Sequence, residues 1–337
     1  MSVRVAINGL GRIGRLTLRA AAESKRNDLE IVAVNNRSGV TAAAHLLKYD
    51  SVHGPFQGDV TVTGDRLDIG SGPIRVFEKS NPEDIDWASE DVDVVLECTG
   101  NFKDRTSCMS HIDAGAKKVL ISAPGSDVDR TVVYGVNHED LAANDNIVSN
   151  ASCTTNCLAP VAKVLQDLCG IESGFMTTIH AYTSDQRILD NSHKDLRRAR
   201  AAGLSLIPTS TGAARALGDV IPELAGKLDG TSIRVPTPNV SLVDLVFVPG
   251  KPVSADDVNA AMAAAAAGPM NGVLAVCTEP LVSTDFNHHP ASAIFDATQT
   301  AAVGDGLIRV AAWYDNEWGF SCRMNDTAVF MGALQGN

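Results

Sequence analysis

The chain lacks an excess of positive charge and a long uninterrupted apolar run, and both absences exclude classes of protein. It has 28 basic against 40 acidic residues, a formal net charge of −12. General nucleic-acid binders usually carry a basic stripe, so we expect no nucleic-acid partner. The alanine run at 260–267 is too short and too interrupted to cross a membrane, so we expect no membrane partner either.

The cysteines show no sign of a disulfide framework. There are seven, an odd number, and they are dispersed along the chain. No targeting pattern precedes the strand that we expect from Val3, so a reducing, cytoplasmic location is the prediction. A length of 337 residues with 45% apolar and 20% charged side chains is typical of a globular protein with two domains.

A glycine-rich turn lies in the first predicted βαβ unit. A strand over 3–7 is followed by Gly9, Gly11 and Gly14, then by a helical pattern over 15–23 and a strand over 31–34. Glycines at this spacing let the backbone approach a pyrophosphate at the helix N-terminus. Further buried parallel strands are expected at 91–97 and 118–122. The first half therefore predicts a Rossmann-type, doubly wound dinucleotide-binding domain.

The end of the second strand bears on which dinucleotide binds. NAD-binding folds usually have an acidic residue there, but this chain has Asn36 followed by Arg37. A neutral amide and a guanidinium can donate hydrogen bonds to a 2′-phosphate, which a carboxylate would repel. The pattern favours NADP. The alternative is that Asn36 binds the ribose of NAD and Arg37 is solvated, so the cofactor prediction is NADP and/or NAD.

Residues 149–157 predict a nucleophile. Cys153 lies where a loop meets a helical pattern, and unpaired N–H groups of a first helical turn favour a thiolate. The alternative is that Cys153 and Cys157, spaced i and i+4, only pack one helix face. His180, near the end of a strand pattern over 174–183, is the candidate base, and as a cation it would stabilise the thiolate.

Three segments carry groups suited to phosphate. They are the long polar stretch 183–200, the segment 208–215 and the segment 234–238, which contain hydroxyls, a glycine and arginines. The long stretch has an alternative explanation as a charged face or a subunit contact. Adjacent His288 and His289 point oppositely on an extended chain, so no metal site is expected.

These residues together resemble the phosphorylating glyceraldehyde-3-phosphate dehydrogenases over essentially the whole chain. The matching segments are 7–14, 97–100, 121–124, 149–157, 180–183, 211–214, 234–238 and 313–318. The resemblance implies a homotetramer that oxidises glyceraldehyde 3-phosphate with inorganic phosphate, in glycolysis, gluconeogenesis or the Calvin cycle. It also implies a catalytic domain at 151–316 with a largely antiparallel sheet, and a nucleotide domain at 1–150 completed by a helix over 317–337.

The resemblance implies roles for individual residues. Cys153 is the nucleophile and His180 the base, while substrate phosphate and inorganic phosphate bind at Ser152, Thr154, Thr183, Arg200, Thr211, Gly212 and Arg234. The cofactor contacts, beyond the glycines and the Asn36–Arg37 pair, are Arg12, Ile13, Ser80, Ser122, Ser192 and Asn316.

Two features are similar to the NADP-using photosynthetic members: Asn36 in place of aspartate and Ser192 in place of proline. Ser80 departs from the arginine that the family pattern predicts, although a backbone contact would survive. Two alternatives remain: an erythrose-4-phosphate dehydrogenase, which shares the cysteine segment, and a regulatory protein that binds nucleotide without catalysis.

Overall fold

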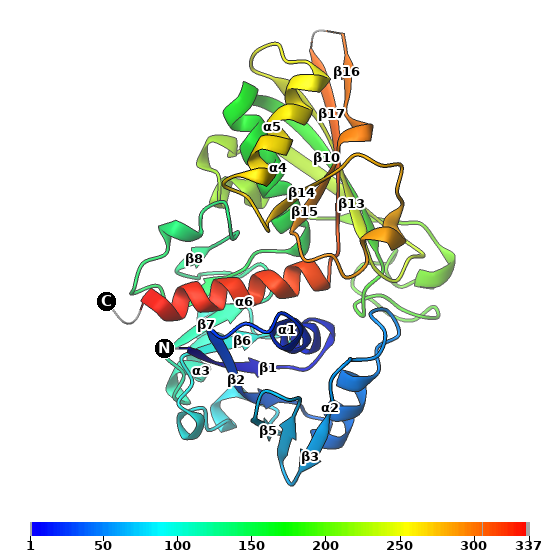
Figure 1. Ribbon diagram of the computed structural model, residues 1–337. Helices are drawn as coiled ribbons and strands as arrows, with labels where there is room; N and C mark the ends of the chain where they lie inside the picture. Colours follow the sequence, from blue (N-terminus) through cyan, green and yellow to red (C-terminus); the bar gives the residue numbers. More distant parts are fainter. Residues whose placement is uncertain (1, 305, 335–337) are drawn as a thin grey trace. The chain divides into compact units, whose positions relative to one another are not determined.

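The computed structural model describes residues 2–304 and 306–334. Backbone contacts divide the chain into two compact units. Unit 1 runs to Ser152 and resumes at Phe320, and unit 2 is Cys153–Gly319. Figure 1 shows the helices and strands of both.

Unit 1 is built on a nine-stranded sheet in the order β3-β4-β5-β2-β1-β6-β7-β9-β8. Neighbouring strands are parallel along the part of the sheet that runs β5-β2-β1-β6-β7-β9-β8. Strands β3 and β4 add an antiparallel edge beside β5. The central strands are almost completely buried, as expected where helices cover both faces of a parallel sheet. The strands are β1 (Val3–Asn8), β2 (Leu29–Asn35), β3 (Thr61–Thr63), β4 (Arg66–Asp68), β5 (Pro73–Phe77), β6 (Val94–Glu97), β7 (Lys118–Ile121), β8 (Arg130–Thr131) and β9 (Ile147–Ser149).

The helices of unit 1 are α1 (Arg12–Glu23), α2 (Gly39–Lys48), α3 (Arg105–Asp113) and the final helix α6 (Trp318–Ala333). Residues Phe320 onward of α6 belong to unit 1, where α6 lies beside α1 (Figure 1). The Asn325 amide donates to the carbonyl of Thr17 across the two helices, at 3.0 Å. The predicted final helix extended to 337, and residues 335–337 of that prediction lie outside the described residues.

Unit 2 contains a mostly antiparallel sheet in the order β11-β12-β10-β13-β17-β15-β14, with β16 paired to β17. Only the pairs β10–β12 and β14–β15 are parallel among those described. The strands are β10 (Ile171–Ala181), β11 (Ile207–Ser210), β12 (Leu228–Val235), β13 (Ser241–Pro249), β14 (Leu274–Cys277), β15 (Ala293–Asp296), β16 (Ala301–Val303) and β17 (Leu307–Tyr314).

Two helices cover this sheet: α4 (Cys153–Cys169) and α5 (Ala255–Ala267). Helix α4 contacts α5 and strands β13, β15 and β17, and most of its residues are buried. Helix α5 begins at a capping box, in which the Ser254 hydroxyl accepts from the Asp257 N–H. The predicted α/β class, with one doubly wound sheet and one largely antiparallel sheet, is confirmed.

No helix within the described residues has both the length and the apolar character needed to cross a membrane. Over the same residues, no three His, Cys, Asp or Glu side chains are arranged to hold a metal ion.

Candidate active site

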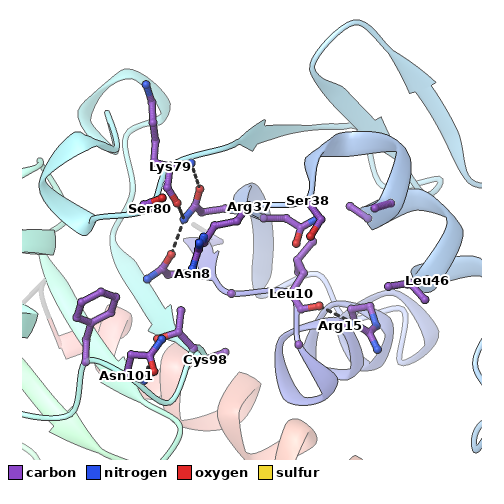
Figure 2. Close-up of a pocket in the computed structure, with 18 residues that line it drawn as sticks. Asn8, Leu10, Arg15, Arg37, Ser38, Leu46, Lys79, Ser80, Cys98 and Asn101 are labelled. Carbon is purple, nitrogen blue, oxygen red and sulfur yellow. Dashed lines mark hydrogen bonds between the residues drawn. The ribbon is translucent and has the colours of Figure 1, made fainter. Parts of the chain in front are cut away.

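Unit 1 has a pocket of about 330 Å³ above the carboxyl ends of β1, β2 and β6 (Figure 2). This is where doubly wound sheets bind their ligands. Its lining is polar along the strand ends and apolar on the α2 side. The lining residues are Asn8–Gly11, Arg15, Asn35–Ser38, Ala42, Ala43, Leu46, Lys79, Ser80, Cys98, Thr99, Asn101 and Phe102.

The glycine-rich turn has the geometry that a pyrophosphate needs. Gly9 has a φ of +95°, and a Cβ at Gly14 would lie 2.0 Å from the carbonyl oxygen of Gly9, so only glycine fits there. A Cβ at Gly11 would meet no atom within 4 Å. Gly11 also begins α1 without a side-chain cap, so the helix N-terminus faces the pocket with no capping side chain over it. These residues fit a dinucleotide.

The end of β2 adds positive charge to this pocket. Nδ2 of Asn36 donates a hydrogen bond to the carbonyl oxygen of Gly39, at 2.9 Å. Arg37 is exposed at the pocket wall. Ser38 begins α2 without a side-chain cap, which places a second helix N-terminus at the wall. Arg37 and Lys79 are both lining residues, and the lining contains no carboxylate. Two cations therefore line this side of the pocket, and the Glu78 carboxylate lies outside the lining against the start of α2, where a Cβ at Gly39 would stand 3.0 Å from its Oε1.

The structure brings together only some of the predicted cofactor residues. Gly9, Gly11, Asn36, Arg37 and Ser80 line the pocket. Arg12, Ile13 and Ser122 are in the same unit but are not lining residues, and the Arg12 guanidinium is paired with Asp50. The sequence analysis missed Lys79, Asn101 and Phe102, because no motif marks loops that meet only in the fold.

In the second unit, Cys153 is the first residue of α4, as the helical pattern predicts. Three residues without regular structure join β9 to α4, and among them Ala151 has a φ of +55°, a left-handed conformation that is uncommon for alanine. Such strain is typical of functional sites. Four residues later Cys157 is fully buried, and its thiol lies 3.7 Å from the carbonyl oxygen of Ala312.

The sulfur of Cys153 lies 3.5 Å from Nε2 of His180, at the end of β10. Burial raises the pKa of the Cys153 thiol, although the charge of Arg234 acts in the opposite direction. Burial and Arg234 lower the pKa of His180 to about 3. Both shifts favour the neutral thiol and the neutral imidazole over the ion pair, so stabilisation of the thiolate by a His180 cation stays a prediction.

Arg234 faces His180 because β10 and β12 pair in parallel with these two residues in register. Its Nη1 lies 2.9 Å from Nδ1 of His180 and 3.0 Å from the carbonyl oxygen of Ala181, and that oxygen lies 2.7 Å from Nδ1. Nδ1 either donates to Ala181 or accepts from Arg234. In the first arrangement the proton is on Nδ1, so Nε2 carries none and its lone pair points toward Cys153, as a general base requires. The Nε atom of Arg234 is buried with no hydrogen-bond partner among the described residues.

Tyr314, on strand β17, links helix α4 to strand β10. It is fully buried, and its hydroxyl lies 2.9 Å from Oγ1 of Thr154 on α4 and 2.8 Å from Oγ1 of Thr178 on β10. The edge of its ring packs against His180, with centroids 5.9 Å apart. The cysteine and histidine therefore come from separate elements that one buried hydroxyl joins.

Comparison with known proteins decides the family. Residues 3–105 match the model of the glyceraldehyde 3-phosphate dehydrogenase NAD binding domain, and residues 152–316 match that of the C-terminal domain. The chain belongs to the glyceraldehyde-3-phosphate dehydrogenase family. It is 60% identical to the enzyme of Xanthobacter flavus and 59% identical to that of Cereibacter sphaeroides, over 99% of this chain and 100% of each relative. The glyceraldehyde-3-phosphate dehydrogenase of Geobacillus stearothermophilus is 52% identical over 99% of both chains.

Family membership confirms the predicted dehydrogenase activity and the NAD-binding N-terminal domain. The segment 183–200, which the sequence predicts to bind phosphate, contains several arginines, and the structure places them in different surroundings. Arg200 has a side chain 67% exposed and paired with Asp190. Arg198 is the arginine whose charge, together with that of Arg234, lowers the pKa of His180. Its side chain is 21% exposed, donates to the hydroxyl of Thr209 and forms an ion pair with Asp185 at 2.7 Å. Three arginines within four positions cannot be ranked from the sequence, and it is burial in the fold that separates Arg198 from Arg200.

The remaining predicted residues of unit 2 lie on polar loops and strand ends. Thr183 and Thr211 are half-buried, and Gly212 is exposed with open space where a Cβ would stand. Ser192 is exposed in a loop closed by Arg187, which donates to the carbonyl of Ser192. Asn316 is buried and accepts a hydrogen bond from Ser241 through its amide oxygen, at 2.8 Å. Ser152, the last residue before unit 2, is half-buried.

Proposed function

We propose that this dehydrogenase accepts NADP as well as NAD, with a preference for NADP, and that Cys153 and His180 carry out the phosphorylating oxidation of glyceraldehyde 3-phosphate. We assign the dinucleotide domain to unit 1 and the catalytic domain to unit 2. The observation that carries the catalytic part is the 3.5 Å approach of the Cys153 sulfur to Nε2 of His180.

In the proposed mechanism, Nε2 of His180 first accepts the thiol proton of Cys153. The sulfur adds to the aldehyde carbon while His180 returns the proton to the carbonyl oxygen, which gives a hemithioacetal. Nε2 of His180 then accepts the hydroxyl proton as this carbon gives up a hydride and becomes a thioester. Bound NAD or NADP supplies the acceptor for the hydride that leaves this carbon. Inorganic phosphate attacks the thioester, releases 1,3-bisphosphoglycerate and returns Cys153 to its starting state. His180 is placed for this role because burial keeps its imidazole neutral and its Nε2 lies 3.5 Å from the sulfur of Cys153.

Arg234 is proposed to bind a phosphate oxygen of substrate. Its buried Nε has no partner among the described residues, and a phosphate would supply one. When Arg234 turns to the anion, the Nδ1–H of His180 keeps its bond to the carbonyl of Ala181, and the base tautomer is selected. Arg198, with Thr183, Thr211, Gly212, Ser152 and Thr154, completes the proposed phosphate-binding set. We assign to Arg198 the role that the resemblance gave to Arg200.

The preference for NADP rests on the pocket of unit 1. A 2′-phosphate would find Arg37, Lys79 and the N-terminus of α2 at the wall, and no carboxylate among the lining residues. Ser192 is proposed as a further contact from a neighbouring subunit, and Asn316 as a contact to the nicotinamide amide. Arg12, Ile13 and Ser122 are proposed to act through their backbone.

We also propose a cytoplasmic homotetramer. Five apolar side chains in the segment 188–206 are strongly exposed, which is unusual for a surface that faces only water. They are Ile188 at 90%, Leu189 at 75%, Leu196 at 81%, Leu204 at 85% and Leu206 at 69%. A second copy of the chain would bury them.

Steady-state kinetics with both nucleotides and two aldehydes test the proposal. We expect glyceraldehyde 3-phosphate to be oxidised only with phosphate present, and faster than erythrose 4-phosphate. A kcat/KM for NAD more than about tenfold above that for NADP would contradict the nucleotide preference. A pulse of a thiol-reactive electrophile, read by mass spectrometry, should label Cys153 selectively over Cys157, whereas a merely regulatory nucleotide-binding protein would show no selectivity.

A further inference from the structure

A row of buried polar side chains crosses the floor of the unit 1 pocket, and the dehydrogenase chemistry makes no use of it. Strands β2, β1 and β6 end in register, so Asn35 is paired with Asn8 and Asn8 with Glu97. Asn35, Asn8 and Glu97 are 4%, 1% and 1% exposed. Asn8 and Asn35 line the pocket, whereas Glu97 lies behind it and is not a lining residue.

Every hydrogen bond in this row has a fixed direction. The backbone N–H of Lys79 donates to Oδ1 of Asn35 at 2.9 Å, and Nδ2 of Asn35 donates back to the carbonyl of Lys79 at 3.0 Å. Backbone groups cannot exchange donor and acceptor roles, so the Asn35 amide has one orientation. Its Nδ2 also donates to Oδ1 of Asn8 at 2.8 Å, which leaves Nδ2 of Asn8 to donate to Glu97, at 2.6 Å.

Glu97 closes the row as a pure acceptor. Its Oε1 accepts from the backbone N–H of Thr99 at 2.7 Å and from the Thr99 hydroxyl, and its Oε2 lies 3.2 Å from Nε2 of His111. Nε1 of Trp87 donates to Nδ1 of His111 at 3.0 Å, so the histidine proton is on Nε2 and points to Glu97. Buried polar groups without partners are costly, which makes a fully satisfied network of this kind rigid.

The other end of the row reaches the pocket wall. Lys79 and Ser80 follow β5, and their exposed side chains line the pocket near Arg37 (Figure 2). Dashed lines in that view mark the bonds that Asn35 makes with Asn8 on one side and with the Lys79 backbone on the other. The wall at Lys79 is therefore joined to a carboxylate that does not itself line the pocket.

We infer that Glu97 is a positioning residue for the nucleotide: by presenting an acceptor to Asn8, it holds that amide against Asn35, whose orientation the Lys79 backbone sets, and so anchors the Lys79–Ser80 wall to the strand ends. This inference rests on the proposal that the dinucleotide binds in this pocket. What the row requires from position 97 is an acceptor that faces Asn8, and not negative charge as such.

Glutamine and methionine at position 97 separate these requirements. In Glu97→Gln the amide oxygen can face Asn8 and His111. The bond from the Thr99 N–H is then lost, while the Thr99 hydroxyl can turn to accept from the new amide nitrogen. In Glu97→Met no acceptor remains, and the Asn8 amide loses its fixed orientation. The probe is ADP-ribose, measured by calorimetric titration of the full-length protein. We expect Kd to rise at least tenfold in Glu97→Met and less than threefold in Glu97→Gln, with hydrogen exchange at the Lys79 amide faster in the methionine variant only.

Asp145 provides a matched control in the same unit. It is 8% exposed, accepts from Arg130 and from the backbone N–H of Ala142, and does not line the pocket. Asp145→Leu should lower the melting temperature and leave the Kd for ADP-ribose within about twofold of the parent protein, since a role limited to stability does not change binding.

The outcomes are separable. If the unaltered protein does not bind ADP-ribose, the proposed nucleotide site is wrong, whatever the role of Glu97. If it binds and Glu97→Met binds equally well, or Glu97→Gln is as weak as Glu97→Met, the inference about Glu97 is overturned. Should Glu97→Met fail to fold, Asn8→Leu breaks the same row one residue further along. Its readout is the exchange rate of the Lys79 amide, and an unchanged rate would also overturn the inference.

Discussion

Nη1 of Arg234 lies 2.9 Å from Nδ1 of His180, so a permanent cation sits beside the imidazole that faces the nucleophile. Together with burial it lowers the pKa of His180 to about 3, and it counteracts the rise that burial causes in the pKa of Cys153. One arginine therefore keeps the base neutral and makes the thiol easier to ionise.

Arg234→Met should raise the pKa of His180 and the pKa of Cys153, because the cation that lowers both is removed. We expect the alkylation rate of Cys153 by iodoacetamide to require higher pH in the variant than in the parent protein. NMR titration of the His180 ring should show protonation at higher pH. A pH profile of alkylation that does not move would contradict the role of Arg234.

The buried neutral His180 also predicts how stability depends on pH. Its folded pKa is about 3 against an ordinary 6.5, so between these values the unfolded chain binds more protons than the folded one. The free energy of unfolding contributed by this group is therefore fully present above pH 6.5 and is lost as pH falls toward 3. His180→Gln should have a shallower loss of stability over this range, measured by urea denaturation at several pH values.

Asn36→Asp should shift the nucleotide preference toward NAD. A carboxylate at the pocket wall would repel the 2′-phosphate and leave the ribose of NAD able to bond to it. We expect kcat/KM for NADP to fall by about ten- to a hundredfold, which corresponds to about 1.4–2.7 kcal/mol, and kcat/KM for NAD to change little. Equal losses with both nucleotides would show that Asn36 acts on the fold rather than on the phosphate.

Arg198→Ala and Arg200→Ala form a matched pair for the phosphate site. Arg198 pairs with Asp185 and Arg200 with Asp190, but only Arg198 is partly buried, donates to Thr209 and lowers the pKa of His180. We expect the alanine variant of Arg198 to raise KM for substrate or for inorganic phosphate by about tenfold or more, as loss of a charged hydrogen bond would. The Arg200 variant should stay within about twofold if surface ion pairs contribute as little here as elsewhere.

Gly14→Ala and Gly11→Ala should separate stability from nucleotide binding. A methyl group at Gly14 would collide with the carbonyl of Gly9, so that variant should melt several degrees lower. At Gly11 the methyl group meets no protein atom, and stability should be nearly unchanged while affinity for ADP-ribose falls. Thermal melting with and without ADP-ribose checks both. If Gly11→Ala binds normally, the pyrophosphate does not approach that turn.

Motifs within short segments predicted a large part of this protein. The glycine turn, the strands of unit 1 and the start of α4 at Cys153 follow from local patterns, because periodicity and helix-terminus chemistry act over a few residues. The pairing of Cys153 with His180 was predicted from residue types, and the distance between them came from the structure.

What the sequence could not supply depends on register and burial. The facing of His180 and Arg234 requires the parallel pairing of β10 with β12, which no local pattern fixes. The low pKa of His180 depends on its burial, which the sequence does not reveal. The proposal of Arg198 rather than Arg200 as a phosphate-binding residue likewise depends on which of the two side chains the fold buries.

The row from Lys79 to Glu97 also has an evolutionary consequence. Each amide in it has a donor end and an acceptor end, so the row has a polarity that a single substitution breaks and a compensating second substitution can restore. Positions 8, 35 and 97 should therefore change together among related chains, or not at all, even though only two of them border the pocket.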